Sequence, residues 1–232
     1  MTDFHTHILP GMDDGSRSAE ESLTMLQMAA AQGVERVAVT PHFDAERESP
    51  DEFLLRRDRA EALLQEATAG RRALPQVCAG AEVRYFEGFS SAESISRLKI
   101  QGTDLLLLEM PFVPWTERMF REIRQAQASL SCTILLAHIE RYLRYQEGRK
   151  FWERLEETGA LIQANAEFFL SRSGRRKALR MLESGRIHLL GSDCHHSIKR
   201  PPNMADAINV ISSRLGSEPL RRMEGLERQL MK

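Results

Sequence analysis

Two histidines and two aspartates near the start of the chain have the residue types and spacing of a metal site. His5 and His7 are one residue apart, and Asp13 and Asp14 follow six and seven positions after His7. Side chains alternate along a β-strand, so a His-x-His pair directs both imidazoles to the same face. The sequence therefore predicts one corner of a metal site. The alternative is a set of ordinary polar residues at a frayed terminus.

Similar residues recur at or near the ends of later apolar stretches. Counting His5 and His7 in the first stretch, six of the seven histidines lie at or near the end of an apolar stretch, His188 being the exception. One such residue alone is usually structural, but scattered surface histidines would not follow strand ends. Imidazole and carboxylate ligands without thiolates suit zinc, manganese and iron. Together with His5, His7 and one aspartate, these candidate ligands are more than one ion needs. The sequence therefore predicts two or three ions bridged by a carboxylate and a water. The later candidates are His42, Glu82, Glu109, His138, Asp193 and His195.

Seven short apolar stretches alternate with charged segments that favour helix. The apolar stretches are TDFHTH, VERVAVTPH, QVCAGAEVRY, DLLLLEM, TILLAH, ALIQANA and IHLLGSD. This alternation implies a parallel sheet, either doubly wound or closed into a (β/α) barrel. A barrel would gather the candidate ligands, because its βα-loops all open at the C-terminal ends of the strands. Helices are predicted over Ser18–Gln32, Pro50–Ala69, Ala92–Lys99, Thr116–Ala128, Arg149–Glu157, Arg175–Glu183, Met204–Leu215 and Leu220–Met231.

Length, net charge and cysteine content exclude several classes of protein. The 232 residues fit one large α/β domain, and we expect a single domain over 1–232. A formal net charge of -1 gives no basic field for nucleic acid. No apolar run is long enough to span a membrane, and no signal peptide is visible. Three widely spaced cysteines argue against a disulfide framework and for the cytoplasm.

The order and spacing of the motifs resemble the PHP (polymerase and histidinol phosphatase) superfamily. Within it, FHTHILPGMDDGSRSAEESLTMLQMAAAQGV, HIERY and RPPNM resemble the bacterial tyrosine phosphatases of capsule and exopolysaccharide regulation. The resemblance runs from Met1 to about Asn209. It implies an α/β fold, a distorted (β/α)7 TIM-like barrel, with a trinuclear and usually manganese-dependent site; iron or zinc would also suit these ligands. The motifs that carry it are His5-x-His7, DDG, His42, Glu82, Glu109, HIERY around His138, and SDCH at Asp193–His195.

The resemblance also implies how three metals share their ligands. Related phosphatases place a histidine where this chain has Asp13, and spacing alone cannot separate two adjacent aspartates. The shared DDG motif favours Asp14. The implied sets are His5, His7, Glu82 and Asp193 for the first metal; Glu82, as a bridge, with Glu109 and His138 for the second; and Asp14, His42 and His195 for the third.

Two arginines match the same family. Arg141 in HIERY and Arg200 in KRPPNM follow ligand-bearing strands and could bind phosphate oxygens bidentately. For Arg141 the alternative is a surface salt bridge with Glu140, and for Arg200 any of the other roles of a loop arginine. No general acid can be assigned, because the adjacent His195 and His196 could exchange roles.

The predicted reaction is phosphomonoester hydrolysis by a metal-bridging hydroxide, without a covalent intermediate. The resemblance suggests a phosphotyrosine protein as substrate, specifically a bacterial tyrosine kinase. Rivals are a histidinol-phosphate phosphatase, a nuclease-type phosphoesterase and a non-catalytic metal-binding barrel. The chain also contains the C-x5-R pattern of cysteine-dependent phosphatases twice, at Cys78 and Cys194. Neither loop is rich in glycine, and acidic neighbours would raise the thiol pKa, so we expect neither cysteine to be a nucleophile.

Overall fold

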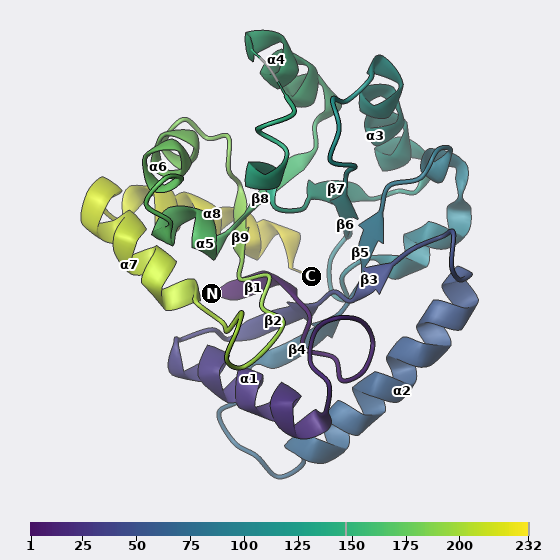
Figure 1. Cartoon of the computed structure of the whole chain (residues 1–232), viewed down its shortest axis with the longest axis vertical. Helices are drawn as coiled ribbons and strands as arrows, with labels where there is room; N and C mark the ends of the chain where they lie inside the picture. The colour runs from purple at the N-terminus through teal and green to yellow at the C-terminus, as the bar shows by residue number, and fades with distance from the viewer. Residues whose placement is uncertain (147, 232) are drawn as a thin grey trace.

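Nine short parallel strands form the centre of the molecule (Figure 1). The computed structural model describes residues 1–146 and 148–231. Every βα unit returns the chain to the same end of the sheet, as the alternation in the sequence predicts. The strands are β1 (Thr2–Thr6), β2 (Arg36–Val39), β3 (His42–Phe43), β4 (Gln76–Ala79), β5 (Glu82–Arg84), β6 (Leu105–Glu109), β7 (Thr133–Leu136), β8 (Leu161–Asn165) and β9 (Leu189–Gly191).

Two of the seven predicted strands are each interrupted once. Thr40 and Pro41 separate β2 from β3, and Gly80 and Ala81 separate β4 from β5. Proline has no N–H to donate to a neighbouring strand, and glycine weakens a strand interior. The halves continue in the same direction, since β2 pairs with β4 and β3 with β5. Nine strands therefore make seven positions in the sheet.

The first and last strands close the sheet. The strands pair in the order β1–β2–β4 in one part of the sheet and β3–β5–β6–β7–β8–β9 in the other. Beyond β9, Cys194 forms a parallel bridge with Thr6, and Asp193 N donates to the His5 carbonyl oxygen at 2.8 Å. The result is the distorted seven-stranded barrel that the family resemblance implies, rather than a doubly wound sheet.

Helices surround the barrel (Figure 1). The first two are capped by Ser18 and Ser49, whose hydroxyl groups accept hydrogen bonds from Glu21 N and Glu52 N. Among the described residues there is no helix with the length and apolar character needed to cross a membrane. The helices are α1 (Ala19–Ala31), α2 (Pro50–Thr68), α3 (Glu117–Ser129), α4 (Gly148–Thr158), α5 (Ala166–Leu170), α6 (Arg175–Glu183), α7 (Met204–Leu215) and α8 (Glu218–Leu230).

Alternate residues of the strands pack into two apolar clusters. On β6, Leu106 and Leu108 belong to the larger cluster, which includes helix residues such as Phe120. Leu105 and Leu107 belong to a smaller cluster with Phe4, inside the barrel. Both faces of β6 are therefore buried, which explains its uninterrupted leucine run. The inner cluster fills the barrel beneath the polar end of the strands.

Two predictions require correction, and one helix lies outside the predicted set. The segment Ala92–Lys99 forms a 3-10 helix over Glu93–Leu98 rather than an α-helix, since it is short and its first residue lacks a side-chain cap. The last strand ends at Gly191, so Asp193 does not lie on a strand; its φ of 53° turns the chain toward the site. Helix α5 is not predicted, because it continues the apolar run of β8 without a break.

Candidate metal centre

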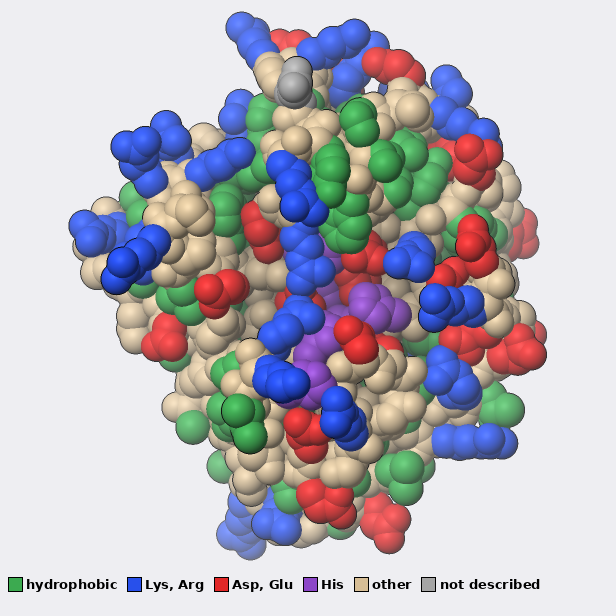
Figure 2. Space-filling model, in the orientation of Figure 1, with side chains coloured by type: hydrophobic (Ala, Val, Ile, Leu, Met, Phe, Trp, Pro, Cys, Tyr) green, Lys and Arg blue, Asp and Glu red, His purple; other side chains and the backbone are tan. Residues whose placement is uncertain are grey.

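The nine predicted ligands converge at the C-terminal ends of the strands. Each has a nitrogen or oxygen atom within 3.7 Å of another member of the set. Figure 2 shows histidines at the centre of this face, with lysine and arginine side chains close around them. We call these residues the histidine–carboxylate cluster: His5, His7, Asp14, His42, Glu82, Glu109, His138, Asp193 and His195.

The residues of the first implied metal lie together. His5 Nε2 and His7 Nε2 are 3.1 Å apart. Asp193 Oδ1 lies 3.7 Å and 3.6 Å from these two nitrogens. Glu82 Oε2 lies 3.1 Å and 3.3 Å from them. Two imidazoles and two carboxylates thus point at one small volume.

Glu82 lies at the centre of the cluster. Its Oε2 is 3.0 Å from His42 Nδ1, and its Oε1 is 2.9 Å from His138 Nε2. Glu109 Oε1 is 3.4 Å from the same nitrogen of His138. Burial acts to raise the pKa of Glu82, but the charge of His5 and hydrogen bonds from neighbouring histidines hold that pKa well below its usual range. Glu82 is therefore an ionised carboxylate with imidazoles on both sides.

Asp13 and Asp14 have different surroundings. Asp14 Oδ1 lies 3.6 Å from His42 Nε2 and 3.5 Å from His195 Nε2. Asp13 instead accepts hydrogen bonds from His7 Nδ1 at 2.7 Å and from His42 N at 2.9 Å. The structure therefore places Asp14, rather than Asp13, with the histidines of the third implied metal. Asp13 orients His7 from behind.

The donor set fits divalent cations. His5 Nε2, His7 Nε2 and Glu82 Oε2 face one another. The space between them does not have room for a proton on both of these nitrogens. Cations between these atoms would satisfy the nitrogen lone pairs and balance the buried carboxylates. Imidazole and carboxylate ligands suit manganese, iron and zinc.

The carboxylates favour the charged forms of two histidines. Burial acts to lower the pKa of His7, but hydrogen bonds to Asp13 and Glu82 outweigh it and raise this pKa to about 10. The pKa of His138 is raised to about 9 in the same way, by Glu109 and Glu82 against burial. The carboxylates thus stabilise positive charge on these two imidazoles, and they would stabilise a bound metal ion for the same reason.

Arg141 and Arg200 both contact Asp193. The Nη2 atoms of Arg141 and Arg200 pair with Asp193 Oδ2, the latter at 2.8 Å. Asn165 Nδ2 donates to the same oxygen at 2.8 Å. Asp193 therefore turns one oxygen to the histidines and the other to the arginines. Arg141 therefore forms its ion pair with Asp193 and not, as in the alternative interpretation of the sequence, with Glu140.

Three supporting residues escaped prediction. On β8, Gln163 Oε1 accepts from His138 N at 2.6 Å, and Gln163 Nε2 donates to Asn165 Oδ1 at 2.9 Å. Their alternation in the apolar strand LIQAN is a signal that could have found them. Gly191 has a different role: a Cβ atom there would lie 2.6 Å from His5 Cβ. Only glycine lets β9 approach β1 this closely.

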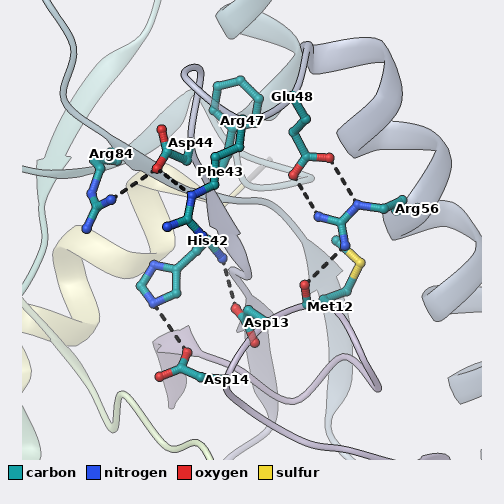
Figure 3. A pocket seen from close by; sticks show the side chains of 10 residues that line it. All are labelled: Met12, Asp13, Asp14, His42, Phe43, Asp44, Arg47, Glu48, Arg56 and Arg84. Atoms are coloured by element: carbon teal, nitrogen blue, oxygen red, sulfur yellow. Dashed lines mark hydrogen bonds and ion pairs between the residues drawn. The ribbon is translucent and has the colours of Figure 1, made fainter.

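Two cavities flank the cluster. One of about 550 Å³ is lined by Arg141, Arg200 and Asn165 among others. The other, of about 610 Å³, lies between the cluster and α2 (Figure 3). In it Arg84 pairs with Asp44 at 3.0 Å and lies 3.9 Å from Glu109 Oε2. The cluster is thus open to a ligand that extends on both sides.

The other reactive residues lie outside the cluster. His196 Nδ1 is 3.6 Å from Glu21 Oε1, and His188 Nδ1 accepts from Ile162 N at 3.1 Å. Burial raises the pKa of the thiols of Cys78 and Cys194, and both side chains are buried. These thiols are therefore protonated at neutral pH, against the behaviour of a nucleophilic cysteine.

A distorted parallel barrel with imidazoles and carboxylates at the C-terminal ends of its strands is the architecture of the PHP class of metal-dependent hydrolases. A family model for capsular polysaccharide synthesis, CpsB/CapC, matches residues 1–225. The chain therefore belongs to the CpsB/CapC family.

Curated relatives and a solved structure agree with this family. The tyrosine-protein phosphatase YwqE of Bacillus subtilis is 29% identical, over 94% of this chain and 86% of its own. The tyrosine-protein phosphatase CpsB of Streptococcus agalactiae is 25% identical, over 94% and 92%. A solved structure, from work on the metal-dependent tyrosine phosphatases YwqE of Bacillus subtilis and CpsB of Streptococcus pneumoniae, superposes with a TM-score of 0.84. It is 26% identical and covers 98% of this chain and 93% of the other.

Proposed function

We propose that this chain is a metal-dependent protein-tyrosine phosphatase that acts in capsule or exopolysaccharide synthesis, as one PHP-type domain over 1–232. The convergence of nine imidazole and carboxylate side chains on one end of the barrel carries this proposal. Membership of the CpsB/CapC family and relatives named tyrosine-protein phosphatases support it.

The cluster would hold three metals, with manganese as the expected ion and iron or zinc as fitting alternatives. Bound divalent metals would supply Lewis acidity, which lowers the pKa of a water nucleophile and withdraws charge from a phosphoryl group. Glu82 is placed to serve as a bridge, because both of its oxygens face imidazoles. The implied ligand sets are those given above: His5, His7, Glu82 and Asp193; Glu82, Glu109 and His138; Asp14, His42 and His195.

Arg141 and Arg200 would bind the phosphoryl oxygens of the substrate. Both guanidinium groups are anchored on Asp193 and remain partly exposed, so their other N–H groups are free to donate to a ligand in the adjoining cavity. Each would stabilise the negative charge of the equatorial oxygens in the transition state. The tyrosyl leaving group is a phenolate with a pKa of about 10, so protonation by a general acid matters less than for a serine ester.

We propose a phosphotyrosine protein, namely a bacterial tyrosine kinase in the cytoplasm, as substrate and partner. The cavities on both sides of the cluster support a peptide substrate that extends in two directions. The smaller histidinol phosphate would leave these cavities empty. Near-neutral net charge disfavours the nuclease alternative. The three free, buried cysteines support a reducing compartment.

Metal dependence and substrate preference test this proposal together. Chelated protein would be assayed with added Mn²⁺, Fe²⁺ or Zn²⁺ on a phosphotyrosine peptide, histidinol phosphate and single-stranded DNA. We expect chelation to abolish turnover, Mn²⁺ to restore it, and the phosphotyrosine peptide to give the highest kcat/KM. Preference for histidinol phosphate would indicate a small-molecule phosphatase. Metal binding without turnover of any substrate would indicate a non-catalytic barrel.

A further inference from the structure

An aromatic side chain lies at the rim of the cluster and has no role in the proposed function so far. Phe112 follows β6 by three residues, so it stands close to Glu109 in the chain. It is 38% exposed. The other large apolar residues that are exposed in the described parts of the chain are aliphatic. In Figure 2, apolar side chains lie beside the histidines on this face.

The ring of Phe112 stacks on buried rings of the site. It lies 6.2 Å from the His138 ring at an interplanar angle of 27°, and 5.6 Å from the Tyr142 ring at 28°. His138 and Tyr142 are fully buried beneath it. Phe112 therefore turns its exposed surface outward, directly above a corner of the cluster.

The loop that carries Phe112 is fixed from both sides. Met110 N donates to Tyr142 Oη at 3.0 Å, and Gln146 Nε2 donates to the Val113 carbonyl oxygen at 2.8 Å. Trp115 N donates in turn to Gln146 Oε1 at 3.2 Å. The aromatic surface is thus preorganised, and a ligand that stacks on it meets little ordering cost.

We propose that Phe112 is a specificity-determining residue that receives the phenyl ring of phosphotyrosine by aromatic stacking. The inference rests on the proposed function, because it requires the phosphoryl group to sit on the cluster. In phosphotyrosine a single oxygen joins phosphorus to the ring, so a bound phosphoryl group brings the ring to the rim where Phe112 lies. Phosphoserine has only a methylene group at this position and gains nothing from an aromatic surface.

The test compares ligands with and without a ring. For the wild type, Phe112→Ala, Phe112→Leu and Phe112→Trp, KM and kcat would be measured on a phosphotyrosine peptide and on p-nitrophenyl phosphate, together with Ki for inorganic phosphate. An aromatic pair contributes an amount equivalent to roughly threefold to tenfold in affinity, so the alanine and leucine variants should raise both KM values by that factor. We expect the tryptophan variant to behave as wild type, and kcat, Ki and bound metal to stay unchanged in all variants.

Val113→Ala is the matched control, since Val113 is the next residue on the same loop and is 45% exposed. It should leave every KM unchanged. The inference is wrong if Phe112→Ala leaves KM unchanged, if Ki for phosphate rises in parallel with KM, or if Val113→Ala has the same effect. These outcomes differ from a failure of the proposed function, in which the wild type itself shows no metal-dependent turnover of phosphotyrosine.

Discussion

Asp13 Oδ2 accepts a hydrogen bond of 2.7 Å from His7 Nδ1. When the imidazole is neutral, this bond keeps its proton on Nδ1, so that Nε2 of His7 can present a lone pair to the cluster. Carboxylates that hold a metal-binding histidine in this way act through the histidine rather than on the metal. The two adjacent aspartates should therefore differ in what they do.

We predict different metal losses in Asp13→Ala and Asp14→Ala. Asp14→Ala should remove one ion per chain even at saturating Mn²⁺, because Asp14 faces His42 and His195. Asp13→Ala should keep the full number of ions but weaken binding by about 10- to 100-fold. Metal analysis after equilibrium dialysis over a range of Mn²⁺ concentrations measures both quantities. Equal stoichiometric losses in the two variants would contradict the assignment.

Arg141→Ala should impair catalysis without removing metal. The lost guanidinium group would donate to transition-state oxygens, and loss of one such donor costs about 100-fold or more in kcat. Arg141→Lys should recover part of the activity, since it keeps the charge but not the planar fork. Arg144→Ala is the control, because its guanidinium carbon lies 4.7 Å over the Tyr145 ring instead. An unchanged kcat/KM in Arg141→Ala, with metal bound, would exclude the phosphate role.

Gly191→Ala should disturb His5. The added Cβ would lie 2.6 Å from His5 Cβ, and such overpacking costs about 1–3 kcal/mol. We expect a lower Tm and weaker metal binding. Gly225→Ala in α8 is the control, since a Cβ there meets nothing within 4 Å and glycine in a helix costs roughly 0.5–1 kcal/mol relative to alanine. Its Tm should rise slightly. Normal metal binding in Gly191→Ala would show that β1 and β9 tolerate separation.

Metal binding should release protons and strengthen as the pH rises. The pKa of His7 is raised to about 10 and that of His138 to about 9, so both carry a proton at neutral pH and must lose it to bind metal. Calorimetric titration with Mn²⁺ in buffers of different ionisation enthalpy counts the protons. In metal-free protein the stabilisation from charged His7 is complete below pH about 6.5 and lost as the pH rises through about 10. A heat independent of the buffer would contradict this.

The fold was predictable where sequence pattern and local structure agree. The leucine run of β6 and the helix after Ser49 show this, since apolar content and capping point to the same elements. The path beyond Gly191 was not predictable, because the left-handed backbone of Asp193 is imposed by hydrogen bonds to another strand. The prediction that Asp193 lies on the last strand is therefore wrong, although the side chains of Asp193 and His195 still reach the cluster.

The ligand types were predictable from strand ends, but their supports were not. Spacing alone does not separate Asp13 from Asp14, whereas the folded loop directs Asp13 to His7 and Asp14 to His42. Gly191 matters because of its closeness to His5, which is far away in the chain, and no local pattern reports this.

The bridge between Thr6 and Cys194 has a consequence for biosynthesis. His5 lies on β1, whereas Asp193 and His195 follow β9, so the ribosome adds His5 and His7 long before it adds the other two residues. Until then, β1 lacks the backbone hydrogen bonds to Asp193 and Cys194 that fix its position beside the last strand. The complete histidine–carboxylate cluster thus cannot assemble before β9 and the turn after it have been synthesised, so loading of the predicted site with metal would follow their synthesis.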